Sequence, residues 1–323
     1  MVIRKKAERN RKMILPLLKL PPHSPTFAKA VVDRIIPGFV DMDRNNSDTF
    51  LIGTQSGLLY VCGNEESSFV KNRLVELFRT RKREGTRFTL FSPTKKWDDV
   101  IQHLLANEIS SIQRYAFSYN KPERSKDEGY PVIHSFGEYS GVGLVNYDNC
   151  EVIKCDDNRD EINYDDNHDG LQNRSENNLP PGFILGRITA DSIDLSRTLN
   201  RAYYEEYWGS VSGFLKNGIG YCVLYENEVV SECTSIFRSA HYAEIDIETS
   251  SGFRGQGLGI GAARAFIDEC MVKGITPCWD CDVSNEASIK LARKLGFGDP
   301  HEYSIFVKHC LTSSVGEQYT DIK

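Results

Sequence analysis

The sequence has no long hydrophobic run, and this absence argues against a membrane span and against a secretory leader. A membrane-spanning helix needs about 18 or more consecutive apolar residues, and no stretch of the 323-residue chain approaches that length. The basic residues 1–12 are followed by a short apolar stretch that Pro16 interrupts, whereas a leader carries an unbroken apolar region. We therefore expect a cytoplasmic protein that does not bind a membrane.

The cysteines form neither a disulfide framework nor a metal-binding pattern. Nine is an odd number, and disulfides are rare in proteins that are not exported. Cys278 and Cys281 have the spacing of a redox motif, but they fall in a predicted strand, where positions three apart point to opposite faces. No second cysteine pair and no histidine pair has zinc spacing. The sequence therefore predicts reduced cysteines and no bound metal.

The formal net charge of −6 is unevenly distributed along the chain. Residues 156–176 contain eight acidic side chains and two arginines, which accounts for the whole excess. The remainder is close to neutral and gives no indication of a nucleic-acid-binding face. Residues 165–176 have the oxygen spacing of an EF-hand calcium loop, but Pro180 and Pro181 follow where an exiting helix would run. The composition favours a flexible linker over a calcium site.

Composition divides the chain into two domains with short flanking segments, which suits its length. A basic segment, residues 1–20, precedes a predicted α/β domain at residues 21–148. The acidic linker or insertion occupies residues 149–178, a second domain residues 179–312, and a tail residues 313–323. The first domain contains no catalytic constellation, so we expect the chemistry in the second.

Hydrophobic periodicity predicts alternating strands and helices in both domains. In the first domain, strands are predicted at residues 50–53, 57–62, 87–91 and 112–119, and helices at 67–80 and 96–106. In the second, helices are predicted at 190–206, 211–217, 260–273 and 285–295, and strands at 220–225, 229–237, 243–249, 277–283 and 303–309.

A glycine-rich turn separates a predicted strand from a predicted helix in the second domain. Residues 242–249 have strand character, and Arg254-Gly255-Gln256-Gly257-Leu258-Gly259 directly precedes the helix. Glycines let the backbone approach an anion closely, and the N–H groups of a helix's first turn point at it. The order of strand, glycine turn and helix therefore predicts a phosphate site.

A second motif further along the chain makes this assignment more specific. Together the two motifs resemble the coenzyme A site of the GCN5-related N-acetyltransferase (GNAT) superfamily, through Arg254, Gly257, Gly259, Asn285, Leu291, Lys294, Gly296 and Phe297. This likeness covers about residues 185–310. A closer resemblance, to a bacterial two-domain GNAT acetyltransferase family, covers most of the chain and includes Leu179-Pro180-Pro181-Gly182-Phe183 and Trp208-Gly209-Ser210.

The resemblance implies an α/β (α+β) chain whose C-terminal part has the GNAT acyl-CoA N-acyltransferase fold. That fold has a mixed, mainly antiparallel sheet, preceded here by a smaller α/β N-terminal domain. It also implies acetyl-CoA as co-substrate, with strand backbone along the pantetheine arm and the glycine turn on the pyrophosphate. The residues so assigned are Ile247, Thr249, Arg254, Gly255, Gln256, Gly257, Leu258, Gly259, Asn285 and Ser288.

Acyl transfer to an amine needs a base for the ammonium and often an acid for the leaving thiolate. Three carboxylates are candidates for the base, two by their match to superfamily branches and one by sharing a strand face: Glu244, Asp280 and Glu248. Many superfamily members carry a tyrosine as the acid where this chain has Ala292. Either Tyr303 or Ser288 takes that role, or the thiolate leaves without help.

The resemblance thus implies an N-acetyltransferase that acts on acetyl-CoA and an amine by direct attack. The alternative, suggested by Ala292, is a CoA-binding regulatory or interaction module with little or no catalysis. The sequence leaves the acceptor open among a small polyamine, an aminoglycoside-like amine, an amino acid and a protein N-terminus. It gives no oligomeric state.

Overall fold

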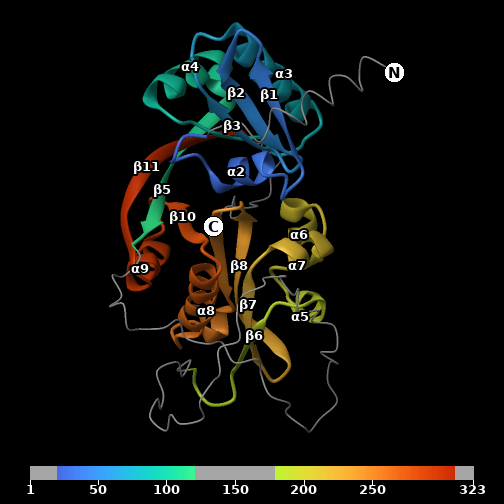
Figure 1. Ribbon diagram of the computed structural model, residues 1–323, viewed down its shortest axis with the longest axis vertical. Helices are drawn as coiled ribbons and strands as arrows, with labels where there is room; N and C mark the ends of the chain where they lie inside the picture. Colours follow the sequence, from blue (N-terminus) through green and yellow to red (C-terminus); the bar gives the residue numbers. More distant parts are fainter. Residues whose placement is uncertain (1–19, 121–178, 310–323) are drawn as a thin grey trace, which may run out of the picture. The chain divides into compact units, whose positions relative to one another are not determined.

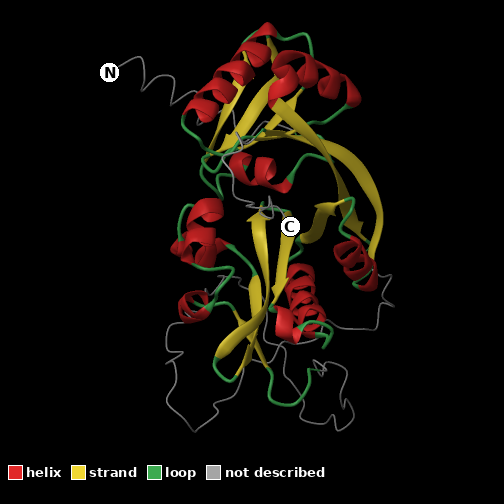
Figure 2. Ribbon diagram, turned by 180° about the vertical axis from the view of Figure 1, so that it is seen from behind, coloured by secondary structure: helices red, strands yellow, loops and turns green. Residues whose placement is uncertain are grey.

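The computed structural model describes residues 20–120 and 179–309, which belong to one compact unit. An eleven-stranded mixed sheet, mostly antiparallel, runs through it in the order β1-β2-β3-β4-β11-β5-β10-β9-β8-β7-β6, with helices on its faces (Figures 1 and 2). The predicted fold class is confirmed. The acidic linker with its calcium-like spacing, the tail, and the basic segment up to residue 19 lie outside the described residues. None of the helices described is long and apolar enough to cross a membrane.

The first half of the described chain combines five strands, of which β3 and β4 pair in parallel, with three α-helices. Its elements are α2 (Thr26–Val32), β1 (Gly38–Asp43), β2 (Asn46–Thr54), β3 (Leu58–Cys62), α3 (Ser68–Arg83), β4 (Thr89–Phe91), α4 (Lys95–Leu105), η2 (Ala106–Glu108) and β5 (Ile109–Tyr119). Side-chain caps define two helix starts, because the hydroxyls of Ser67 and Thr94 accept from the N–H groups of Val70 and Trp97.

The second half carries the predicted glycine turn. Its elements are β6 (Ile184–Arg187), α5 (Ala190–Leu195), α6 (Arg201–Trp208), α7 (Val211–Asn217), β7 (Gly220–Tyr225), β8 (Glu228–Arg238), β9 (Tyr242–Thr249), η3 (Ser251–Phe253), α8 (Leu258–Val272), β10 (Thr276–Asp282), α9 (Glu286–Lys294) and β11 (Phe297–Lys308).

Several boundaries differ from the sequence predictions. The single helix predicted at residues 190–206 is two helices, because Ser196 has extended backbone and its hydroxyl donates to Glu232 at 2.7 Å. Asn200 then caps the second helix. The short elements α2, β1 and β6 were not predicted, and β11 begins at Phe297 rather than at Tyr303. Short or irregular elements carry too few periods of a hydrophobic pattern to be detected.

The two halves repeat one order of elements. β1, β2, β3, α3, β4, α4 and β5 correspond in sequence to β7, β8, β9, α8, β10, α9 and β11. In each half the first three strands are antiparallel neighbours. A helix then connects the third strand to a parallel fourth strand, β3 to β4 and β9 to β10. The described chain is therefore a structural repeat, which the sequence analysis did not detect.

The last strands of the two halves are exchanged. β5 pairs antiparallel with β10, the fourth strand of the second half, and β11 pairs antiparallel with β4, the fourth strand of the first. β5 and β11 also pair with each other, with His301 opposite Ala116, and lie side by side in Figure 1. Each half therefore needs the other to complete the centre of the sheet.

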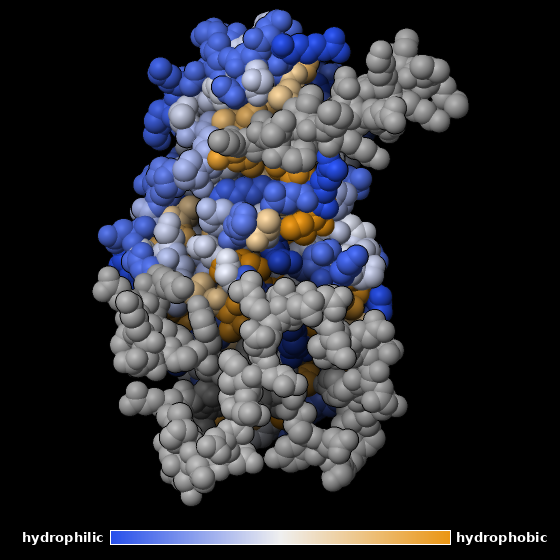
Figure 3. Space-filling view, in the orientation of Figure 1, coloured by the Kyte–Doolittle hydropathy of each residue, from blue (hydrophilic) through white to orange (hydrophobic). Residues whose placement is uncertain are grey.

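Three clusters of buried apolar side chains hold these layers together. One lies under α8 and α9 and includes Ile245 and Phe266, and its counterpart under α3 and α4 includes Leu59 and Trp97. The third joins α2 to α6 and α7 around Phe27. The outer surface over α3 and α4 is mainly hydrophilic in Figure 3. The apolar stripes of the helices thus face the sheet, as amphipathic helices require.

Candidate active site

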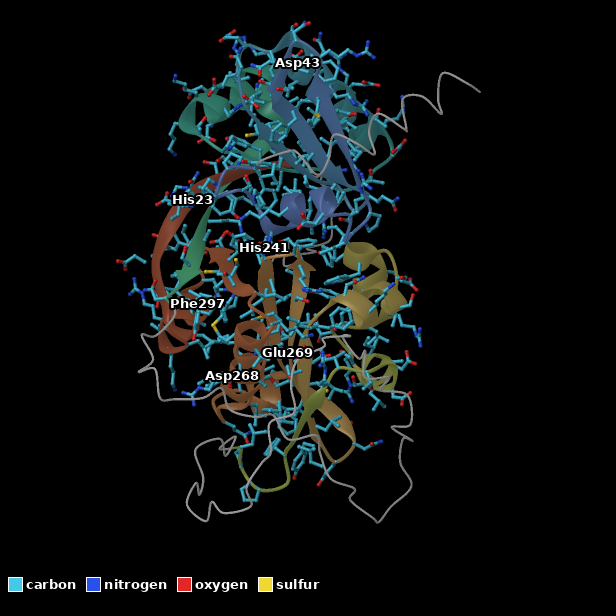
Figure 4. The ribbon with its side chains drawn as sticks, in the orientation of Figure 1. His23, Asp43, His241, Asp268, Glu269 and Phe297 are labelled. Atoms are coloured by element: carbon cyan, nitrogen blue, oxygen red, sulfur yellow. The ribbon has the colours of Figure 1, made fainter. Side chains whose placement is uncertain are left out.

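β9 and β10 are parallel neighbours only over their first residues. The Thr276 N–H donates to the carbonyl of His241 at 2.8 Å, beside the start of β9 (Figure 4), and the last paired position sets Glu244 opposite Cys278. Beyond it, β10 pairs with β5 while β9 continues beside β8 to Thr249. Within the described residues, no strand adjoins the β10 side of β9 after Glu244. An extended arm can hydrogen-bond to such an edge as an added strand does.

The glycine turn leads directly into α8. The N-cap of α8 is Gly257, and no described side chain caps its first turn, so these N–H groups can bind an anion. Gly255 and Gly257 have φ angles of 80° and 81°, which favour glycine. At Gly259 a Cβ would lie 3.2 Å from Thr249 Oγ1, so glycine lets α8 approach β9 closely. The turn therefore fits a pyrophosphate held by backbone N–H groups.

Arg254 stands beside this turn and already contacts β9. Its Nε donates to the carbonyl oxygen of Thr249 at 2.9 Å, and its Nη2 forms an ion pair with Glu248 Oε1 at 3.0 Å. The Arg254 side chain remains 63% exposed, whereas that of Glu248 is only 14% exposed. The guanidinium is therefore close to the turn and accessible to an incoming phosphate.

The other two predicted CoA contacts lie at the start of α9. Asn285 is the N-cap of α9, where its Oδ1 accepts from the Ser288 N–H at 3.0 Å. The Ser288 hydroxyl accepts from the indole Nε1 of Trp279 at 2.9 Å. Asn285 thus stands at the end of β10 that diverges from β9, while Ser288 is turned toward a buried residue of β10.

Carboxylates occupy one face of β9. Side chains alternate along a strand, and Ala243 and Ile245 belong to the cluster beneath α8. Glu244, Asp246 and Glu248 therefore point to the opposite face. The hydroxyl of Tyr203 on α6 donates to Asp246 Oδ2 at 2.8 Å. The face opposite α8 is thus acidic and is partly covered by α6.

Glu244 combines burial with an acidic neighbourhood. Burial, and after it the charge of Asp280, raises the pKa of Glu244 to about 7, while a hydrogen bond from Thr26 and the charge of Arg114 act in the opposite direction. Thr26 begins α2, so the first half of the chain contributes to this site. A carboxylate with this pKa can accept a proton at neutral pH.

Asp280 accepts hydrogen bonds from two residues of β5 and β11, the strands that the two halves exchange. The guanidinium Nε of Arg114 on β5 donates to Asp280 Oδ1 at 2.5 Å, and the hydroxyl of Tyr303 on β11 donates to Oδ2 at 2.5 Å. Burial raises the pKa of Asp280, and the charge of Arg114 opposes that rise. Burial, followed by the charge of Asp280, raises the pKa of Tyr303 well above its usual value. Asp280 is thus part of a hydrogen-bonded triad.

The described residues also contain two surface hollows away from this site. One, of about 470 Å³, is lined by residues of α4, β5 and β11, and the other, of about 230 Å³, by Pro37, the turn after β2 and part of α6. Within the described part of the chain, no group of three or more histidine, cysteine, aspartate or glutamate side chains is arranged to hold a metal.

Comparison with known proteins places the chain in a family. The sequence profile of the family described as GNAT acetyltransferase matches residues 16–306. The chain belongs to this GNAT acetyltransferase family. It is 36% identical over 285 residues to the uncharacterised N-acetyltransferase YdfB of Bacillus subtilis, a match that covers 88% of this chain and 90% of that protein. The resemblance predicted from the two motifs is confirmed.

Solved structures of low sequence identity share the GNAT fold of this chain. A GCN5-related N-acetyltransferase-like protein from Streptococcus suis has a TM-score of 0.57 at 19% identity, covering 93% of this chain and 98% of that one. A tandem GNAT protein from the clavulanic acid biosynthesis pathway has a TM-score of 0.51 at 12% identity, covering 91% and 93%.

The first half of this GNAT chain repeats the strand order but not the glycine turn. Between β3 and α3 lie Glu65 and Glu66, which would repel an anion, and the Ser67 hydroxyl already caps α3. The indole of the fully buried Trp97 donates to the carbonyl of Gly63 at 3.0 Å. Among the described residues, the segment of the first half that corresponds to the glycine turn therefore does not resemble an anion site.

Sequence reasoning missed several residues around the predicted carboxylates. Asp246 could have been found, because it alternates with Glu244 and Glu248 on one strand. Thr26 and Arg114 were not predicted as site residues, because they reach the site from the first half of the chain. Of the predicted residues, Glu244, Asp280 and Tyr303 lie together, whereas Glu248 lies near Arg254 at the other end of β9.

Proposed function

We propose that this chain transfers an acetyl group from acetyl-CoA to an amine, in the cytoplasm. The observation that carries the proposal is that β9 separates from β10 after Glu244 and then leads to the glycine turn at the start of α8. This arrangement offers an extended edge for the pantetheine arm and an anion site for the pyrophosphate in a single line.

The donor would be held mainly by backbone groups. The N–H groups of residues 255–259, with Arg254 beside them, would bind the pyrophosphate. Ile247 and Thr249 would hydrogen-bond the pantetheine arm, with Asn285 and Ser288 on the β10 side. The thioester would then lie toward Glu244, where the two strands come together. We also propose that residues 149–178 form a linker or insertion between an N-terminal domain and the acetyltransferase domain.

We propose Glu244 as the base. Glu248 is engaged by Arg254, and Asp280 by Arg114 and Tyr303, so these two remain second candidates. Glu244 would accept a proton from the ammonium of the acceptor. The freed amine nitrogen would attack the thioester carbonyl carbon, a C–N bond would form, the C–S bond would break, and the nitrogen would release its second proton to solvent.

The leaving thiolate takes a proton from Tyr303 or from solvent. At the position where many members of the superfamily carry a tyrosine, Ala292 is fully buried and offers no proton. This observation favours one competing function, a CoA-binding module with little catalysis. The hydroxyl of Tyr303 faces Asp280, and therefore any proton it gives up leaves a phenolate close to a carboxylate.

Two measurements test the proposed function together. Calorimetry with acetyl-CoA should show binding that Gly257→Asp abolishes, because it adds a Cβ at positive φ and a carboxylate beside the pyrophosphate. Gly274→Asp, at another glycine with positive φ and open space, is the matched control. Thiol release with a panel of amines then separates an enzyme from a binding module. Unchanged affinity in a folded Gly257→Asp protein would contradict the donor site.

A further inference from the structure

The acidic face of β9 continues onto β8 through a buried glutamate. Glu232 lies directly opposite Glu248 in the antiparallel ladder between β8 and β9. Directly opposite residues share a face, with Cβ atoms about 5 Å apart, and like charges in that position destabilise a sheet. Glu232 is only 4% exposed. The sheet therefore keeps two carboxyl groups together in an arrangement that costs stability.

One oxygen of Glu232 lacks a hydrogen-bond partner. Its Oε2 accepts from the Ser196 hydroxyl at 2.7 Å, but its buried Oε1 has no partner among the described residues. The charged groups that act on it, Asp246 and Glu248, are both acidic. Burial, opposed by hydrogen bonds from the Ser196 hydroxyl and from the backbone N–H of Leu199, raises the pKa of Glu232 to about 7. Buried polar atoms are almost always satisfied, so an orphan acceptor among carboxylates indicates a missing donor.

A cationic group on the acceptor substrate would supply the missing hydrogen-bond donor. Positions along a strand rise by about 3.3 Å per residue, so Asp246 and Glu248 lie roughly 7 and 13 Å from Glu244. A linear molecule can therefore reach from Glu244 to the carboxylates of β8 and β9. An ammonium group supplies three donors and one positive charge, and a charge-assisted hydrogen bond satisfies a buried carboxylate well.

We propose that Glu232, together with Asp246 and Glu248, binds a second protonated amino group of the acceptor, which is therefore a linear diamine or polyamine. This inference rests on the proposed acetyl transfer. One amino group reacts beside Glu244, and the other stays protonated among the carboxylates of β8 and β9. A monoamine of the same length leaves Glu232 Oε1 without a donor and binds less well.

Putrescine and butylamine test this directly, because they differ only in the second amino group. With acetyl-CoA, thiol release should give a kcat/KM for putrescine that exceeds that for butylamine by roughly 10–100-fold, the value of a charge-assisted hydrogen bond. Glu232→Gln, which keeps the shape and the oxygen that faces Ser196, should lower that ratio about tenfold or more.

Glu228→Gln is the matched control, because Glu228 is also on β8 but is 61% exposed and pairs with Arg197. It should leave the ratio unchanged. A wild-type ratio near one, an unchanged ratio in Glu232→Gln, or no turnover of either amine by a protein that binds acetyl-CoA would each overturn the diamine site. A protein that binds no acetyl-CoA in calorimetry would instead overturn the proposed function itself.

Discussion

Arg254 and Glu248 form an ion pair of 3.0 Å that links the glycine turn to the acidic face of β9. The same guanidinium is proposed to bind the pyrophosphate. Donor binding would therefore draw Arg254 away from Glu248 and leave the acidic face more negative. In the proposed reaction the two substrates would be coupled through this one side chain, and the acceptor should bind more tightly once acetyl-CoA is in place.

This coupling gives the first prediction. Glu248→Gln should tighten acetyl-CoA binding several-fold, because Arg254 no longer has to leave a carboxylate, while Arg254→Gln should weaken it by about tenfold, the loss of a charge-assisted contact. Calorimetry measures both affinities. Arg264→Gln, an exposed arginine on α8, is the control. Weaker binding in Glu248→Gln would contradict the coupling.

The second prediction concerns Glu244. Only the deprotonated carboxylate accepts a proton, so the rate should rise with pH through about 7, the pKa that burial gives this group. Glu244→Gln should lower kcat by about 10²–10⁴-fold, the usual contribution of a general base, and remove that limb of the profile. Acetyl-CoA affinity should be retained. If Glu244→Gln keeps both kcat and the limb, another group is the base.

The third prediction concerns the pair of Arg114 and Asp280, whose side chains are 3% and 14% exposed. Asp280→Asn removes the ion-pair partner of a buried guanidinium and should lower the free energy of unfolding by about 3–5 kcal/mol. Adding Arg114→Met should recover part of this loss, because the two residues interact directly. Urea unfolding measures both changes.

A surface pair gives the control for that measurement. Lys290 and Glu286 form an ion pair with side chains 77% and 79% exposed. Lys290→Met should change the free energy of unfolding by less than about 1 kcal/mol. If Asp280→Asn is as mild as this control, the buried pair does not contribute to folding as inferred.

The fourth prediction is a pH dependence of stability. Burial raises the pKa of Glu232 from 4.5 in the unfolded chain to about 7 in the fold. The folded state then binds more protons than the unfolded state between these values, so stability falls as pH rises through that window. Glu232→Gln should reduce this loss in the free energy of unfolding by at most about 3 kcal/mol. Glu244 shifts in the same direction, so part of the fall should remain.

The readout is the melting temperature of both proteins at pH 5 and pH 8. The variant should gain more at pH 8, where the wild type must ionise a buried carboxyl group. Glu228→Gln, on the same strand but exposed, should follow the wild type at both values. An equal gain at pH 5 and pH 8 would show that ionisation of Glu232 does not limit stability.

The strand, the glycine turn and the helix of the proposed donor site could be predicted from the sequence because they are local. Residues 242–259 contain a strand, a glycine turn and a helix start in one continuous stretch, and each part follows from chemistry that neighbouring residues supply. Glu244 was a candidate base because its place on that strand matches a branch of the superfamily, and its role stays a prediction. Only Asp246 was overlooked there, although its alternation with Glu244 was readable.

The remainder depends on pairings that no local pattern encodes. Arg114 reaches Asp280 across 166 positions of sequence, and a hydrophobic strand pattern does not say which strand will be its neighbour. Glu232 is important only because the register sets it opposite Glu248. The structural repeat was hidden because its halves share an order of elements and not a motif.

The exchange of β5 and β11 has a consequence for how the protein is made. β5 leaves the ribosome long before β10 and β11, the strands that flank it. Ala116, for example, pairs with His301, which is synthesised much later. At about 5–20 residues per second, that wait lasts roughly 10–40 s. During this time β4 and β5 present open backbone edges, which other nascent chains can join. Expression in cells should therefore depend strongly on temperature and on chaperones, more than the stability of the finished fold would suggest.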